Sequence, residues 1–273
     1  MTPNDLTPWL DDAERFALEA GRLLMEGWRG APDVQQKGRI DLVTEYDLKS
    51  EALLRERMRD AFPEHGWVGE ETDAVHRDRE LVWFVDPIDG TTNFAHGHFY
   101  FGVSIGLAQR SERGLEPLLG VVHAPALGVT WKGIVGAGAW RNEETIQVSQ
   151  VDRLEAALVA TGFPYDRGTS EDNNLAEANA LIPRVQGIRR CGAAALDVCL
   201  VADSTYDAYW EQKVSPWDIC AGLAIAAAAG ATLTDYEGKP ATADSRRLVV
   251  ANPGLHATLL RGVQEARRRA THS

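Results

Sequence analysis

Two aspartates three positions apart are the residues best suited to chemistry in this sequence. They belong to the run Asp86-Pro87-Ile88-Asp89-Gly90-Thr91-Thr92. Proline removes an amide and fixes φ, and glycine lets the backbone approach a ligand closely, so both carboxylates can be aimed into one turn. The amides of Gly90, Thr91 and Thr92 can open a helix whose N-terminus binds phosphate. The alternative is a plain surface turn, because Asp, Pro and Gly are common turn residues.

Three more acidic positions are candidates to join this pair. Glu70 lies in Gly69-Glu70-Glu71, which by itself is also typical of a solvated loop. Asp218 stands at the expected start of an alanine-rich helix, where Asp is equally favoured as a cap. Asp47 completes Thr44-Glu45-Tyr46-Asp47, a spacing close to that of a capping box. Beside a metal, Asp47 and a threonine could instead orient and deprotonate an attacking water, and the sequence leaves both interpretations open.

The four residues Glu70, Asp86, Asp89 and Asp218 offer only oxygen ligands. Hard cations such as Mg²⁺ or Mn²⁺ prefer this type of ligand, and Zn²⁺ fits it less well. Two such ions about 4 Å apart can polarise a phosphate, lower the pKa of a water and stabilise the leaving alkoxide. With 40 Asp and Glu against 28 Lys and Arg, a formal charge of -12, the overall field repels nucleic acid, anionic membranes and phosphate esters. Bound divalent cations would reverse that sign locally.

These carboxylates need elements that hold them together. Apolar residues at steps of three and four predict a helix over residues 13–28, and a second helix is expected over about 44–61. The apolar run 81–85 predicts a strand that is buried on both faces and stops at Asp86. Beyond it, Gly and Pro separate the expected strands of an antiparallel meander at 99–107, 118–123, 128–131 and 136–140.

Strands and helices alternate after about residue 145. Strands are expected at 158–161, 188–190, 206–210 and 248–251, and helices at 171–181, 193–202, 219–229 and about 254–269. We therefore expect an α+β half over 1–145 that carries most of the metal ligands. An α/β half over 146–273 would hold the substrate pocket and Asp218, and the two halves would form one compact unit.

Composition and motifs exclude several other classes of protein. The apolar fraction of 44% and the charged fraction of 25% are those of a globular protein, and the 3 cysteines lack C-x-x-C spacing. No H-E-x-x-H spacing and no G-x-S-x-G elbow is present, which argues against zinc or covalent-serine hydrolysis. The acidic N-terminus and the lack of an apolar run of ~20 residues predict a cytoplasmic protein without a membrane span.

In their order and wording, the motifs resemble those of the inositol monophosphatase family, part of a lithium-sensitive, metal-dependent phosphatase superfamily that includes fructose-1,6-bisphosphatases. The resemblance covers about 41–230 and rests on Asp41 to Thr44 with Asp47, residues 69–71, 83–94 and 192–197, Glu211, and Trp217-Asp218 with Ala221-Gly222. It implies a layered α-β-α-β-α sandwich, commonly homodimeric. The implied activity is Mg²⁺-dependent hydrolysis of a phosphomonoester, first of all inositol 1-phosphate, without a phosphoenzyme.

The resemblance also assigns metal ligands residue by residue. Glu70, Asp86 and the Ile88 carbonyl would bind a first ion. Asp86, Asp89 and Asp218 would bind a second, and Glu70 would also face a third. Mn²⁺ is an alternative to Mg²⁺ in these positions.

Catalytic and substrate-binding roles follow from the same resemblance. Thr91 and Asp47 would activate the attacking water, and the amides of Gly90 and Thr91 would hold the phosphate. Ala194 and Glu211 would line the pocket for a sugar or sugar alcohol. Two departures concern substrate choice: Ala193 stands where many relatives carry Ser or Thr, and Ala231 stands where a second Gly is usual.

Other phosphatases of the superfamily are the nearest alternatives, because the same metal site serves fructose 1,6-bisphosphate, 3'-phosphoadenosine 5'-phosphate and histidinol phosphate. From another class, the chain could be a regulatory binding protein that keeps the fold. Basic groups at Arg189-Arg190 and Arg267-Arg268-Arg269 could contact RNA, but a solvated helix end explains the second group better. We expect a small phosphorylated substrate as the partner, and neither a membrane nor nucleic acid.

Overall fold

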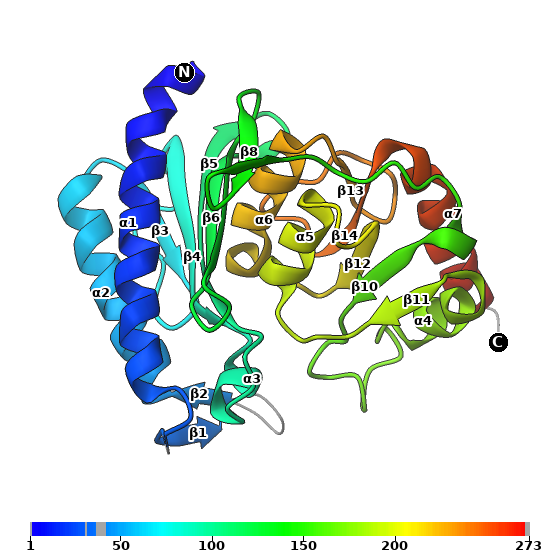
Figure 1. Ribbon diagram of the computed structural model, residues 1–273, viewed down its shortest axis with the longest axis horizontal. Helices are drawn as coiled ribbons and strands as arrows, with labels where there is room; N and C mark the ends of the chain where they lie inside the picture. The colour runs from blue at the N-terminus through cyan, green and yellow to red at the C-terminus, as the bar shows by residue number, and fades with distance from the viewer. Residues whose placement is uncertain (1, 31, 37–41, 271–273) are drawn as a thin grey trace.

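The computed structural model describes residues 2–30, 32–36 and 42–270. Helices and sheets alternate in five layers (Figure 1). The outer helix pairs are α1 with α2 and α4 with α7, while α5 and α6 lie between the two sheets. This arrangement confirms the predicted α-β-α-β-α sandwich. Among the described residues, no helix combines the length and apolar character of a membrane span.

The first sheet has seven strands in the order β3-β4-β5-β6-β7-β8-β9. Their bounds are Gly66–Gly69, Leu81–Asp89, Gly102–Ser111, Gly114–Ala124, Val129–Ile134, Gly138–Arg141 and Glu144–Ile146. β3 and β4 are parallel, and each later strand is antiparallel to its neighbour. The meander predicted after residue 99 is confirmed, with strand ends shifted from their predicted positions.

Helices α1 (Pro3–Gly27) and α2 (Glu45–Ala61) cover the outer face of this sheet (Figure 1). α1 starts at Pro3 rather than Ala13, because Thr2 and Asp5 form a capping box at its N-terminus. Its buried Phe16 belongs to one apolar cluster with Val121 of β6. A small ladder of β1 (Val34–Gln36) and β2 (Leu42–Thr44) precedes α2.

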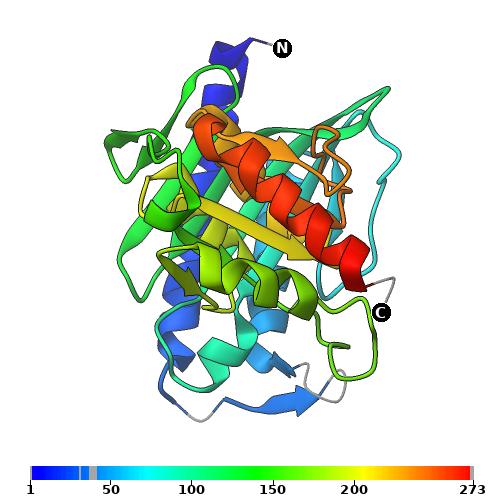
Figure 2. The same ribbon diagram turned by 90° about the vertical axis from the view of Figure 1, so that its right-hand side faces the viewer.

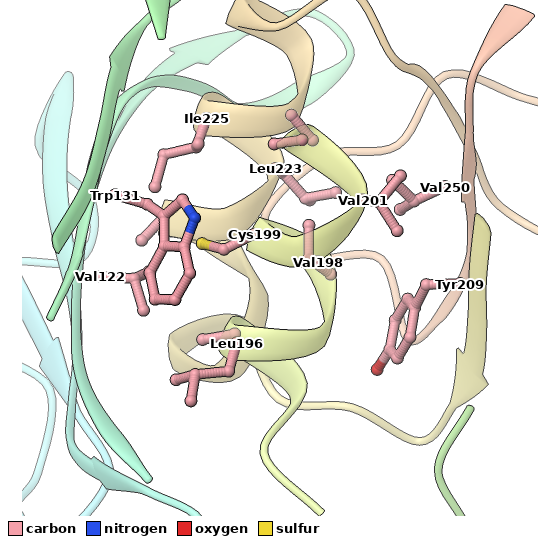
Figure 3. Packing of buried hydrophobic residues seen from close by; sticks show 14 of the residues in the cluster. Val122, Trp131, Leu196, Val198, Cys199, Val201, Tyr209, Leu223, Ile225 and Val250 are labelled. Atoms are coloured by element: carbon pink, nitrogen blue, oxygen red, sulfur yellow. The ribbon is translucent and has the colours of Figure 1, made fainter. Parts of the chain in front are cut away.

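The central helices α5 (Ala194–Ala202) and α6 (Pro216–Ala228) are apolar all round because a sheet lies on each side. Figure 3 shows their side chains between Val122 and Trp131 of the first sheet and Tyr209 and Val250 of the second. α6 lies so close to the first sheet that two strand positions must be glycine. A Cβ at Gly106 would lie 2.5 Å from the Ala221 nitrogen, and one at Gly120 would lie 2.3 Å from the Ala221 oxygen.

The second sheet has five strands in the order β11-β10-β12-β14-β13. Their bounds in that order are Gly187–Arg189, Leu158–Thr161, Ala208–Gln212, Arg247–Ala251 and Thr232–Thr234. β10 is parallel to both β11 and β12, whereas β14 is antiparallel to β12 and β13. Helices α4 (Leu175–Leu181) and α7 (Pro253–Ala270) cross its outer face (Figure 2).

Several local expectations were incomplete. β4 does not stop at Asp86 but continues to Asp89, with a shift of pairing register between these residues. The short strands β1, β2, β3, β9 and β13 were not predicted, because three or four residues carry too little periodicity to be recognised. Short 3₁₀ turns at Leu154–Ala156 and Ile182–Arg184 were also missed. The division of the chain near residue 145 stays a prediction.

Candidate active site

A cavity of about 250 Å³ gathers residues from distant parts of the chain. Its walls come from the end of β4, the N-termini of α5 and α6, the end of β12 and the loop after β10. Nine residues of the predicted site line it: Glu70, Asp86, Ile88, Asp89, Gly90, Thr91, Ala194, Glu211 and Asp218. The exposed Thr92 does not, and Asp47 is buried behind Thr91. Asp41, which opens the first matched motif, lies outside the described residues.

The two aspartates at the end of β4 have different hydrogen-bond partners. Asp86 accepts a hydrogen bond at Oδ1 from the Ile88 amide at 2.9 Å. Asp89 accepts from the Ala194 and Ala195 amides at 3.0 and 2.8 Å. These are the first amides of α5, so the Asp89 carboxylate also stabilises the N-terminus of that helix. The pairing register of β4 with β5 shifts between the two aspartates. This shift lets the two carboxylates of one strand point toward different partners.

Asp218 reaches the same cavity from α6. Ser215 is the N-cap of this helix, and its amide donates to Asp218 Oδ2 at 2.7 Å in a capping box. The helix is tied to the first sheet by Ser104, whose Oγ donates to the Trp217 carbonyl at 3.2 Å. Ser104 pairs with Asp86 across β4 and β5. The capping role considered from sequence is therefore real, and it holds the Asp218 carboxylate at the cavity.

Burial and mutual repulsion govern the charges of this group. Burial raises the pKa of Asp86 well above its usual range, and the neighbouring carboxylates of Glu70, Asp89 and Asp218 add to the effect. Burial and the charge of Asp218 likewise raise the pKa of Asp89, against hydrogen bonds from the α5 amides. The folded chain thus concentrates negative charge in a site where water cannot disperse it.

A divalent cation fits this donor set, because it would neutralise the repulsion and accept oxygen ligands from all sides. Within the described part of the chain, no three His, Cys, Asp or Glu side chains stand together as a ready-made metal cluster. The carboxylates line one cavity and supply only oxygen donors, which suit Mg²⁺, an ion that keeps several of its waters and binds proteins through few carboxylates.

Asp47 caps α2, as one interpretation of the sequence expected, and it also contacts a threonine of the cavity. The Thr44 amide and hydroxyl donate to Asp47 Oδ2 at 2.7 and 2.6 Å, which forms the capping box of α2. The other oxygen, Oδ1, accepts from Thr91 Oγ1 at 2.9 Å. Thr91 Oγ1 also lies 3.1 Å from the Ile88 carbonyl. One buried carboxylate therefore orients a hydroxyl at the edge of the cavity.

Glu211, near the end of β12, also lines the cavity. Tyr209 Oη donates to Glu211 Oε2 at 2.6 Å. Burial raises the pKa of Glu211 to about 7, although Tyr209 and Arg190 oppose that shift. Gly162 leaves room for this carboxylate, because a Cβ there would lie 2.0 Å from Glu211 Oε2.

Two cations at the cavity were not predicted as site residues. Arg190 and Lys213 both line it. Lys213 adopts a positive φ of 61°, and its Nζ lies 2.6 Å from Asp166 Oδ2 and 2.9 Å from Ser170 Oγ in the loop after β10. Arg190 had been noted only as part of a basic pair. Nothing in the sequence around Lys213 signals its backbone conformation or its position.

Comparisons with known proteins agree with one another. A profile of the inositol monophosphatase family matches residues 5–268. An inositol-1-monophosphatase of Synechocystis is 37% identical, with 95% of this chain and 90% of the relative covered. A Vibrio cholerae protein named Nus factor SuhB is 33% identical, with 94% and 96% covered. The solved structure of an inositol monophosphatase from Anabaena matches with a TM-score of 0.87 at 38% identity, covering 96% of this chain and 97% of that one.

Proposed function

The chain belongs to the inositol monophosphatase family, a family of phosphatases, and from this premise we propose that it hydrolyses inositol 1-phosphate to inositol and phosphate. The observation that carries the proposal is the shared cavity of about 250 Å³. Its lining combines carboxylates of β4 and α6, the Thr91 hydroxyl that is hydrogen-bonded to Asp47, and Glu211 of β12. The cavity thus combines a cation site, a group able to take a proton and a polar wall for a substrate alcohol.

Two or three Mg²⁺ ions, or Mn²⁺ in their place, would polarise the phosphate and acidify the attacking water. In the proposed assignment Glu70, Asp86, Asp89, Asp218 and the Ile88 carbonyl hold these ions. Asp47 takes the water's proton through Thr91, because Asp47 is buried and already accepts from that hydroxyl. The amides of Gly90 and Thr91 bind the phosphate. Water attacks phosphorus directly, and no phosphoenzyme forms.

The polar wall supports a sugar alcohol as the leaving group. Glu211 can accept hydrogen bonds from vicinal hydroxyls, and the Ala194 position adds little bulk beside it. The relative from Synechocystis is named for its action on inositol 1-phosphate. Fructose 1,6-bisphosphate, 3'-phosphoadenosine 5'-phosphate and histidinol phosphate are the competing esters.

The experiment is phosphate release from these four esters with Mg²⁺ and with EDTA. We expect EDTA-sensitive turnover that is strongest for inositol 1-phosphate. If another ester is preferred, the metal-site assignment stands and the pocket assignment falls. If none is cleaved, the chain is better explained as a regulatory binding protein, the alternative to which the relative named Nus factor SuhB adds weight.

The homodimer implied by the family resemblance stays a prediction. Size-exclusion chromatography with light scattering tests it directly, since the 29.9 kDa chain would elute with twice that mass.

A further inference from the structure

Helix α2 carries a second buried carboxylate one turn after Asp47. Asp47 and Glu51 are 0% and 1% exposed, and their spacing places them on one face of the helix. A buried carboxylate is costly unless it is well hydrogen-bonded. Asp47 is explained by its contacts with Thr44 and Thr91. Glu51 faces a different segment, the turn that follows β3.

Two residues of this turn donate hydrogen bonds to the Glu51 carboxylate, and the last residue of β3 lies close to it. Its Oε2 accepts from the Glu71 amide at 2.7 Å, and its Oε1 accepts from Thr72 Oγ1 at 2.5 Å. A Cβ at Gly69 would lie 2.6 Å from the Glu51 Cδ, so glycine is needed where β3 ends. The residues immediately before and after Glu70 are therefore fixed against one carboxylate.

Glu70 and Glu51 lie on opposite sides of the turn. Glu70 lines the cavity of about 250 Å³, whereas Glu51, Glu71 and Thr72 line a separate cavity of about 630 Å³. Glu51 does not line the reaction cavity. Any influence of Glu51 on the chemistry must pass through the turn that carries Glu70.

We propose that Glu51 is a positioning residue that fixes the Glu70 turn, so that the Glu70 carboxylate and Asp86 can share a divalent cation. This role rests on the metal site of the proposed function. Through two carboxylates one turn apart, α2 then sets both the direction of the Thr91 hydroxyl and the position of Glu70. Groups that orient a metal ligand without touching the ion commonly change metal affinity by about 10- to 100-fold.

A purely structural role predicts a different result. If Glu51 only stabilised the fold, its replacement would lower the free energy of unfolding and leave the ion affinity of the folded protein unchanged. The neighbouring cavity of about 630 Å³ gives water access to the hydrogen bonds that a neutral amide in place of the Glu51 carboxylate would weaken. Water can satisfy the Glu71 amide, but it cannot hold the turn in one position. We therefore expect the folded state to persist with a less well-defined turn.

The test is Mn²⁺ binding to the metal-free full-length chain without substrate, with free Mn²⁺ measured by electron paramagnetic resonance. Glu51→Gln should bind about 10- to 100-fold more weakly than the wild type, while the thermal midpoint of the metal-free protein stays nearly unchanged. Glu56→Gln is the matched control, because it removes the same charge from an exposed position of the same helix. Equal Mn²⁺ affinity in the two variants would overturn the inference.

Thr72→Val provides the same test if Glu51→Gln does not fold. This variant removes one of the two hydrogen bonds to Glu51 and should weaken Mn²⁺ binding by a smaller factor, several-fold. Where both variants fold, the double variant should lose less affinity than the two separate losses predict, because both act through one contact. Additive losses, or an unchanged affinity in Thr72→Val, contradict the positioning role. A wild type that binds no Mn²⁺ overturns the proposed function itself.

Discussion

Acidic side chains gather in two regions of the molecule, and their neighbours differ in charge. At the cavity, Asp86 and Asp89 have other carboxylates around them, and burial with this repulsion raises the pKa of both. Behind the second sheet, Arg267 Nη1 lies 2.9 Å from Asp172 Oδ1 and 2.8 Å from Glu177 Oε1. Burial opposes ionisation of Asp172, but hydrogen bonds from Arg247 and Arg267 outweigh it and lower the pKa of Asp172.

The difference separates a region that stabilises the fold from the proposed binding region. A carboxylate with a lowered pKa favours folding above its unfolded pKa and loses that effect as the pH falls. A carboxylate with a raised pKa favours folding while protonated and loses that effect as the pH rises through the folded pKa. At neutral pH the arginine network therefore supports the fold, whereas the cavity carboxylates oppose it, and the proposed cation would remove that opposition.

The largest expected effect tests the binding region. Asp89→Asn should reduce kcat by on the order of 10³-fold or more, because it removes a proposed ion ligand and a charge on which catalysis depends. The metal-free variant should remain as stable as the wild type, since the substitution also removes a source of repulsion. Phosphate release and thermal unfolding measure the two quantities. Full activity in this variant would refute the metal-ligand assignment.

Metal addition tests the same region without a substitution. At a Mg²⁺ concentration of 100 times the Kd, the metal-free protein should gain about 2.7 kcal/mol of unfolding free energy. At one fixed Mg²⁺ concentration the gain should be larger at pH 8 than at pH 5, because protonated aspartates cannot bind the ion and the Kd is therefore weaker at pH 5. Calorimetry in EDTA and in Mg²⁺ provides the measurement, with Asp89→Asn as the control. An equal gain in wild type and variant would place the ion elsewhere.

Replacing Arg267 should produce the opposite pattern from Asp89→Asn. Arg267→Met leaves the buried Glu177 without its cation and should cost about 2 kcal/mol of unfolding free energy, a value reduced from that of a fully buried pair because Arg267 is partly exposed. Urea denaturation measures the loss, and phosphate release under stable conditions should show an unchanged kcat. A large drop in kcat with normal stability would mean that the two regions are not separate.

The smallest expected effect concerns Glu211. Burial raises its pKa, as for the cavity aspartates, but a nearby arginine opposes the shift, as in the arginine network. Because its folded pKa of about 7 exceeds the ordinary value of 4.5, Glu211 favours folding only while protonated. The KM for inositol 1-phosphate should fall several-fold as the pH rises through 7, since a charged acceptor strengthens hydrogen bonds to the substrate hydroxyls by about 1 kcal/mol.

Glu211→Gln isolates that contribution from the titration of the substrate phosphate. The variant should lack this pH-dependent fall in KM and should unfold at a higher temperature than the wild type at pH 8. Identical KM profiles in wild type and variant would remove Glu211 from the substrate pocket.

Much of the fold and the candidate site was predictable because the signals are local. Capping spacing identified the start of α2, the apolar run identified β4, and nine predicted site residues line one cavity. The expectation for the C-terminal arginines was incomplete. Arg267 was interpreted as part of a solvated helix end, but it contacts Asp172, Glu177 and Gln212. These partners come from remote segments, so local pattern could not identify them.

The sequence by itself determined which residue types are available: four carboxylates and a Thr with Asp47, each in a recognisable local motif. Tertiary structure alone decided which groups of the site have shifted pKa values and which residues hold the site in place. The pKa of Glu211 depends on burial beside Tyr209, Lys213 reaches the cavity through a left-handed backbone conformation, and Glu51 meets the Glu70 turn across a helix-sheet contact. The physical reason is that desolvation and hydrogen bonding depend on spatial neighbours, and these neighbours are far apart in the chain.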